Sequence, residues 1–249
     1  MSTSRLFIGE SRLLFDGPLL ELDWHQHSFA CVLIGVDGEI EITGPSAQAR
    51  KRARIVLAGP ALSHRLEFAW TRVLSLYIPP HDPDFERLSH AHHVSLSTSW
   101  GPNWETALRI WMEREDASAL ADAVATDFGQ DRGARMDHRV KRVVKRLWHG
   151  EGLRSGTRDM ADWVGLSASR LSALLKQSTG SSLGQLQIAY RFWHSARAML
   201  TVETFTEAAH AADFADAAHF SRSFKQSYGL PPSMIVLEKS AFARCETLG

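Results

Sequence analysis

The sequence lacks any run of about 18 apolar residues, which is roughly the length that a membrane-spanning helix needs. It therefore predicts no membrane span and no membrane partner. Residues 1–17 contain no continuous apolar core, because Glu10 and Asp16 interrupt them, so we expect no secretion signal. Only two cysteines occur, Cys31 and Cys245, and their wide separation fits no metal-binding motif. Together these absences predict a cytoplasmic protein with free thiols.

The 249-residue chain has no net charge, but its two halves carry opposite net charges. Residues 1–136 hold 13 basic and 18 acidic residues, a net charge of −5, whereas residues 137–240 hold 14 and 9, a net charge of +5. A chain of this length predicts two domains, which we place at residues 1–130 and 137–240. The basic domain is the one expected to meet a polyanion.

The first hundred residues have the pattern of short strands. Residues 28–36 are rich in strand formers, Asp37-Gly38 is typical of a hairpin turn, and residues 39–43 alternate apolar and polar side chains. Further apolar runs, separated in several places by proline and glycine, cover residues 55–57, 66–68 and 73–78. Strands at this spacing predict a small barrel or sandwich.

The later part of the chain changes to the periodicity of helices. Two amphipathic helices are expected after the strands, with inward positions at Leu108, Trp111, Met112, Leu120, Val124 and Phe128. A polar stretch with two glycines, residues 129–135, predicts the linker. Residues 138–148 then form a helix whose basic side chains we interpret as a solvated face around a core stripe. The fold class is therefore α+β, with an all-α C-terminal domain.

An internal repeat carries the functional argument. Residues 171–180 read LSALLKQSTG and residues 220–229 read FSRSFKQSYG, with five identities at an offset of 49 residues. Such self-similarity indicates a repeated structural unit.

A helix and a tight turn precede each copy of the repeat. In the first, Thr157 is expected to cap a helix, Gly165 to end it with a positive φ, and Ser167 to cap the next helix. In the second, Asp213 takes the place of the glycine and Asp216 is the expected cap. Each unit therefore has the helix-turn-helix pattern.

The second copy, DFADAAHFSRSFKQSYGLPPS, resembles the signature segment of the AraC family of transcription regulators. The first copy, MADWVGLSASRLSALLKQSTG, resembles the first helix-turn-helix of that family, and the segment from Tyr190 to Leu200 resembles the helix that joins the two. The match covers residues 137–240. Asp213 and Ala215 depart from the usual glycine and polar residue.

The resemblance implies double-stranded DNA as the partner. Recognition helices present their N-terminal turns to the base edges of the major groove. The expected contacts are Ser169, Arg170, Ser172, Lys176, Arg191, His219, Ser221, Arg222 and Lys225. Arg222 is the one side chain among the predicted base-facing positions that can grip a guanine with two hydrogen bonds, whereas the lysines, Arg170 and Arg191 suit phosphates.

The N-terminal pattern resembles the cupin-like barrel that serves as the sensor in many such regulators. His25, His27 and His64 are candidate effector-binding residues there. Two of them, as an HxH pair, share one face of a strand, as metal-binding histidines of cupin enzymes do. No acidic residue follows His27 until Asp37, so we assign no metal and no cofactor, and whether these histidines bind a metal stays open.

The sequence thus predicts a DNA-binding transcription regulator, not an enzyme, whose barrel binds a small-molecule effector or supports a homodimer. If it is an activator, RNA polymerase is a further partner. Two alternatives stay open: a metal-dependent cupin-type enzyme with an accessory helical domain, and a partner-binding helical module without DNA contacts.

Overall fold

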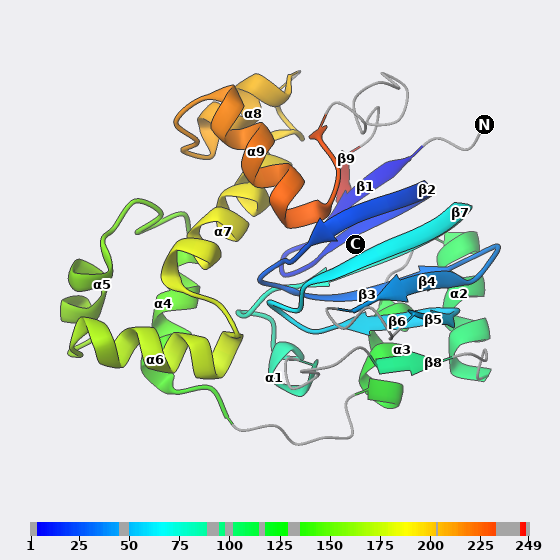
Figure 1. Cartoon of the computed structure of the whole chain (residues 1–249), viewed down its shortest axis with the longest axis horizontal. Coiled ribbons are helices and arrows are strands. Elements are labelled where there is room, and N and C mark those ends of the chain that lie inside the picture. The colour runs from blue at the N-terminus through cyan, green and yellow to red at the C-terminus, as the bar shows by residue number, and fades with distance from the viewer. Residues whose placement is uncertain are drawn as a thin grey trace.

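The computed structural model describes residues 4–44, 50–88, 95–97, 102–114, 118–128, 135–202, 204–232 and 245–247. The N-terminal half forms a strongly curved sheet, and the C-terminal half forms a group of helices beside it (Figure 1). The predicted α+β fold, a barrel-like sheet with trailing helices followed by a helical domain, is confirmed. The linker expected at residues 129–135 lies outside the described residues except for Arg135.

The described strands form one sheet in the order β8-β6-β3-β7-β2-β1-β9, with β4 paired to both β5 and β7. Their bounds are β1 (Arg5–Ile8), β2 (Leu13–His25), β3 (Ala30–Gly35), β4 (Ile40–Thr43), β5 (Arg50–Ala53), β6 (Ile55–Ala58), β7 (His64–Ile78), β8 (Ser95–Ser97) and β9 (Cys245–Thr247). The described pairs are antiparallel except that β9 joins β1 in parallel. The C-terminal segment therefore returns to the N-terminal strand (Figure 1).

Two long strands, β2 and β7, give the sheet its curvature. They pair from Leu13 opposite Tyr77 to His25 opposite His64, with register shifts along the way. The first half of β7 also pairs with β4, and its second half pairs with β3. Register shifts increase local twist, which lets the sheet curl toward closure. The separate strands expected at residues 66–68 and 73–78 are therefore one strand.

Two sequence-based expectations about the sheet are wrong. His25 and His27 were expected to share one face of a strand, but β2 ends at His25 and His27 lies beyond it. Asp37 and Gly38 lie in a bend, but β3 and β4 do not pair with each other in the described residues. Each instead pairs with a different half of β7, because β7 is long enough to pair with both strands.

The described helices comprise two after the sheet and six in the C-terminal half, besides one short helix. Their bounds are α1 (Phe85–Leu88), α2 (Pro102–Arg114), α3 (Ser118–Phe128), α4 (His138–Trp148), α5 (Thr157–Trp163), α6 (Ala168–Thr179), α7 (Leu183–Ala198), α8 (Phe205–Ala211) and α9 (Ala217–Tyr228). In the described ranges no helix combines the length and the apolarity needed to cross a membrane.

The first helix-turn-helix unit consists of α5 and α6. Gly165 has a φ of +71°, which a glycine adopts without steric cost, and Ser167 accepts a hydrogen bond from the amide of Arg170 at the start of α6. Both expectations are confirmed. Thr157, however, is the first residue of α5 rather than its cap, and Gly156 takes the cap position without a side-chain hydrogen bond.

The second unit consists of α8 and α9 and repeats the design with different residues. Asp213 has a φ of +66°, as expected for the residue that replaces glycine, and its carboxylate lies 2.9 Å from the guanidinium of Arg154. Asp216 caps α9 by accepting from the amide of His219 at 2.6 Å. Both copies of the repeat end at a glycine in the left-handed region, Gly180 and Gly229. The repeat in sequence is therefore a repeat in structure.

The helix that joins the two units, α7, also fastens them to the barrel. Tyr190 and Trp193 are fully buried, with ring centroids 5.5 Å and 6.5 Å from that of Phe29. His81 stacks on Trp148 at 4.5 Å, and its Nδ1 lies 3.1 Å from the Tyr190 hydroxyl. One hydrophobic core therefore runs from the sheet into the helical domain. We call this contact zone the seam.

The seam predicts a pH-dependent stability. Burial lowers the pKa of His81 to about 4, with His149 and His194 adding to the effect and Asp82 opposing it. Between about pH 6.5 and pH 4 the unfolded chain binds a proton that the folded chain does not, so stability falls as the pH falls through this window. At pH 5 the loss from this group is about 2 kcal/mol. His81→Asn should flatten the slope of unfolding free energy against pH by about one proton.

Denaturant titrations between pH 7.5 and pH 4.5 measure this slope. His210→Asn, at an exposed position on α8, is the matched control. An equal slope in the wild type and in His81→Asn would contradict the assignment.

Candidate DNA interface and ligand cavity

The outward face of α6 offers short side chains with few available donors. Ser169, Ser172 and Lys176 are all exposed. The Ser169 hydroxyl lies 3.2 Å from that of Ser167, and the Ser172 hydroxyl donates to the carbonyl of Ala168 at 2.9 Å. Lys176 donates to the carbonyl of Gly180 at 2.6 Å. This helix therefore suits close backbone approach and phosphate contacts more than base readout.

The outward face of α9 carries longer hydrogen-bond donors than that of α6. Arg222 and Lys225 are exposed one turn apart, whereas Ser221 and His219 are half-buried. The His219 ring lies 5.6 Å from that of Phe214, which fixes one side of the imidazole against the core of the unit. The exposed guanidinium of Arg222 has the planar fork that pairs with the O6 and N7 atoms of guanine.

Arg191 does not share this face. It is half-buried on α7, donates to the carbonyl of Leu153 at 2.5 Å, and lies over the ring of Phe214 at 6.0 Å. Burial lowers the pKa of its guanidinium. Its side chain thus lies between the segment before α5 and the turn of the second unit, and the phosphate contact expected for Arg191 stays a prediction.

A basic surface beside the first unit was missed in the sequence. The guanidinium groups of Arg142 and Arg146 lie 4.7 Å and 4.4 Å from the ring of Trp163, which is 40% exposed. The signal was available as an arginine pair spaced by four residues on the helix at 138–148, which we interpreted as a solvated face. Stacking on an indole orders the exposed Arg142 at the surface, as a phosphate contact requires, whereas Arg146 is half-buried and its Nε lies 3.6 Å from the carboxylate of Glu151.

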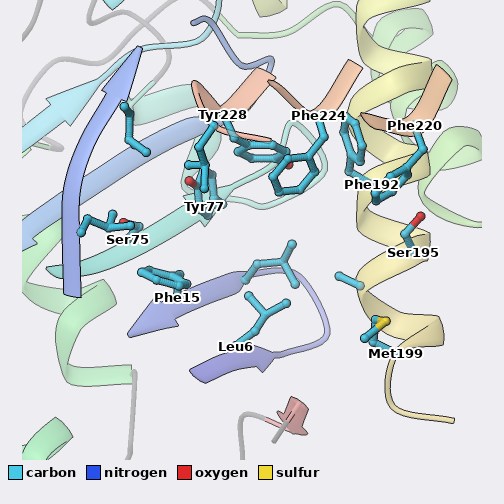
Figure 2. Close-up of a pocket in the computed structure, with 15 residues that line it drawn as sticks. Leu6, Phe15, Ser75, Tyr77, Phe192, Ser195, Met199, Phe220, Phe224 and Tyr228 are labelled. Carbon is cyan, nitrogen blue, oxygen red and sulfur yellow. The ribbon is translucent and has the colours of Figure 1, made fainter. Parts of the chain in front are cut away.

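A cavity of about 120 Å³ lies between the barrel and the second helix-turn-helix unit. Its walls come from β1, β2 and β7 on one side and from α7 and α9 on the other (Figure 2). The lining residues are Leu6, Leu13, Phe15, Leu19, Leu22, Ser75, Tyr77, Phe192, Ser195, Ala196, Met199, Phe220, Phe224, Tyr228 and Leu230. The inner face of the second recognition helix is thus one wall of the cavity.

The chemistry of this cavity is apolar and uncharged. None of the described lining residues carries a formal charge. Burial raises the pKa of Tyr77 and of Tyr228, so both phenols stay neutral at physiological pH. The Oγ atom of Ser195 is buried and has no hydrogen-bond partner among the described residues. A molecule with an apolar body and one hydrogen-bonding group matches these walls.

The three candidate effector histidines meet where the barrel faces the helical domain, next to a second cavity of about 140 Å³ that residues of both line. His27 lines this cavity, but His25 and His64 line neither cavity. Burial lowers the pKa of all three, that of His27 to about 3, and their mutual repulsion adds to the shifts of His27 and His64. All three imidazoles are therefore neutral at pH 7.

Comparison with known proteins identifies the helical domain. A family model described as a helix-turn-helix domain matches residues 160–236, a range that begins within α5 and covers α6 to α9. The C-terminal domain is an AraC-type helix-turn-helix domain. The resemblance to AraC-type regulators predicted from the repeat is thereby confirmed. No curated protein matches the chain.

Solved structures of ToxT are similar to this chain over most of its length. ToxT from Vibrio cholerae O395 superposes with a TM-score of 0.66 at 14% identity, covering 92% of this chain and 98% of that chain. Unsaturated fatty acid-bound wild-type ToxT from Vibrio cholerae strain SCE256 gives 0.64 at 15% identity, covering 95% of this chain and 98% of that chain. At such identities the likeness establishes the fold.

The unequal faces of α6 and α9 in the AraC-type domain predict unequal roles. Arg222→Ala should cost about 1–3 kcal/mol on the preferred DNA site and relax the preference at one or two base pairs. Ser172→Ala should cost less, because its hydroxyl already bonds within α6. Lys225→Ala should weaken binding to all sequences alike.

Binding titrations against the site and its single-base variants separate these effects. If Arg222→Ala loses affinity equally on every variant while Ser172→Ala changes the preferred base, the first unit is the reader and our assignment of roles is wrong.

Proposed function

We propose that this chain is a sequence-specific DNA-binding transcription regulator whose affinity for DNA is set by a neutral, mostly apolar small molecule in the cavity at the seam. The observation that carries the proposal is the shared use of α9. Its outer face presents Arg222 and Lys225, and its inner face, with Phe220, Phe224 and Tyr228, closes the cavity. A ligand that fills the cavity therefore touches the back of a recognition helix.

The paired units argue for DNA rather than for a protein partner alone. Their outward faces carry exposed cations at Arg170, Lys176, Arg222 and Lys225, and the stacked arginines of α4 extend the basic surface. Two helix-turn-helix units on one chain can engage two successive stretches of the major groove. RNA polymerase contact and dimerisation stay predictions.

The lining of the cavity selects the class of effector. The neighbouring ToxT structures bind acids: one holds an unsaturated fatty acid and another (E)-4-(8-methylnaphthalen-1-yl)but-3-enoic acid. A carboxylate needs a counter-charge when it is buried, because transfer of an unpaired ion from water is very costly. The described lining here offers only hydroxyl groups, Ser75, Ser195, Tyr77 and Tyr228. These favour an alcohol, an ester or another neutral amphiphile.

DNA binding is tested first without any ligand. Genomic fragments selected by the purified protein should share a common sequence. Because several lysines and arginines displace counterions, affinity for that sequence should fall by roughly tenfold to a thousandfold between low and moderate salt. A protein that selects no common sequence, or whose affinity is flat in salt, is not the proposed regulator.

The effector class is tested with a matched pair of ligands, 1-decanol and decanoic acid. The alcohol should raise the unfolding temperature and change DNA affinity, and the acid at neutral pH should do so far less. Ala196→Leu places extra atoms in the cavity and should abolish the effect of the alcohol, whereas Ala198→Leu, on the same helix but outside the lining, should keep it. An equal response to the acid would refute the neutral class.

Ser195→Ala provides an internal check on the polar group of the ligand. Loss of one neutral hydrogen bond should weaken 1-decanol binding by about 0.5–1.5 kcal/mol. The same substitution removes a buried hydroxyl that has no hydrogen-bond partner among the described residues, so the ligand-free protein should be no less stable than the wild type. Unchanged affinity for the alcohol would place its hydroxyl elsewhere.

A further inference from the structure

Three histidines from two strand ends form a buried cluster at the seam. His25 ends β2, His64 begins β7 directly opposite it, and His27 follows two residues after His25. Their ring centroids lie 4.3 Å (His25 to His64), 5.4 Å (His27 to His64) and 5.9 Å (His25 to His27) apart. One nitrogen from each ring lies within 4.8 Å of the other two.

Hydrogen bonds fix the orientation of every ring in the cluster. The Nδ1 atoms of His25, His27 and His64 lie 2.7 Å, 2.8 Å and 2.9 Å from the backbone carbonyls of Asp23, Phe29 and Leu62. A carbonyl only accepts, so each Nδ1 carries the proton and each Nε2 keeps a lone pair. Metal-bound histidines are held in the same way, with the second nitrogen donating to a carbonyl or carboxylate.

A cluster of ordinary core histidines would use its remaining nitrogens within the protein. The Nε2 atom of His64 does not: it is fully buried and has no partner among the described residues. Leaving such a buried acceptor unpaired is unfavourable, because it loses its hydrogen bonds to water and gains none in return. This penalty is removed if a group that binds the Nε2 lone pairs, such as a metal ion, occupies the space between the rings.

We propose that His25, His27 and His64 bind one divalent transition-metal ion through their Nε2 atoms. Three neutral imidazoles and no described carboxylate suit zinc and its neighbours rather than calcium or magnesium, which require oxygen ligands. Three protein ligands leave a coordination position for water or another small molecule. Zinc–nitrogen bonds of about 2.0–2.1 Å require the rings to draw closer than they stand here.

This site also lies where both helix-turn-helix units rest on the barrel. The glycine that ends α9, Gly229, is packed so tightly that a Cβ there would stand 2.8 Å from Nδ1 of His25 and 2.6 Å from the carbonyl oxygen of Asp23. The glycine that ends α6, Gly180, would place a Cβ 3.1 Å from the carbonyl oxygen of Pro60, in the loop before His64. An ion that draws the rings together therefore acts on both contacts.

Backbone hydrogen bonds continue this coupling. The amide of Asp23 donates to the carbonyl of Gly229 at 3.0 Å, and the amide of Gln26 donates to that of Gln226 at 3.4 Å. The ion would hold the strand end that carries these bonds. This role goes beyond the proposed effector cavity and does not depend on DNA binding for its test.

Metal uptake by the full chain tests the site directly. Protein stripped with EDTA and desalted is titrated with Co²⁺ while visible ligand-field absorption is followed, and Zn²⁺ is then added as a competitor. We expect saturation at one ion per chain with a dissociation constant on the order of micromolar or tighter. His27→Gln and His64→Gln should each weaken uptake about a hundredfold or more. His210→Gln, an exposed histidine outside the cluster, is the matched control.

Two measurements on the wild type keep the proposal testable if the variants fail to fold. X-ray absorption fine structure of the zinc-loaded protein should count three imidazole ligands, and hydrogen exchange should slow at residues 23–27 and 226–229 when zinc is added. Absence of saturable uptake, fewer than three imidazoles, or uptake that His27→Gln and His64→Gln both leave unchanged would overturn the site. Uptake without any change in exchange would overturn the coupling to α9.

Discussion

The packing of α7 against the barrel is the constraint on which the rest of the structure depends. Tyr190 and Trp193 are fully buried at this contact, and the ring of Phe29 from the sheet lies against both. Burial of each such aromatic side chain contributes on the order of 1.5–3 kcal/mol, so the seam resembles the interior of one domain more than a contact between two. Because α7 also joins the two helix-turn-helix units, its position on the barrel sets where both recognition helices stand.

The two halves of the chain share a core at the seam, although their compositions differ. Sequence composition divides them at the linker, and the opposite charges of the halves support that division. The core, however, crosses the division through His81, Trp148 and Tyr190. Cutting the linker would leave these contacts in place, and isolating residues 137–240 would expose them to water. The cavity and the histidine cluster both lie between the barrel and the helical domain, so a ligand bound at either one would contact the helical side directly and not through the linker.

Local features of the fold were predictable from the sequence, and long-range ones were not. Gly165, Asp213, Ser167 and Asp216 revealed the turns and caps of both units because each acts within a few residues of itself. The pairing of β3 and β4 with different halves of β7 depends on partners distant in sequence, so the hairpin signal at Asp37-Gly38 was misleading. Local pattern carries no information about which of two possible partners a strand selects.

In the candidate site, too, the local features were predictable from the sequence and the long-range ones were not. Arg222 could be assigned to the outer face of its helix because helical periodicity places it opposite Phe220 and Phe224. The same periodicity could not show that those two phenylalanines face a cavity shared with the barrel. Arg191 was expected to suit a phosphate contact, yet its guanidinium donates to the carbonyl of Leu153, 38 residues away in the sequence. The nearness of His64 to His25 likewise follows only from the register of β2 with β7.

The two recognition helices make different contacts with the barrel, and this difference limits how far a ligand at the seam could change DNA binding. Helix α6 contacts the barrel near its final glycine, whereas α9 contributes a wall of the cavity and ends on the strand that carries His25. A ligand shifts an equilibrium only by its difference in affinity for two states, and a tenfold to hundredfold difference is worth about 1.4–2.7 kcal/mol. One bidentate arginine–guanine contact is worth about the same. A signal at the seam would therefore have enough free energy to engage or release the base contact proposed for Arg222, while the phosphate contacts proposed for the first unit persist.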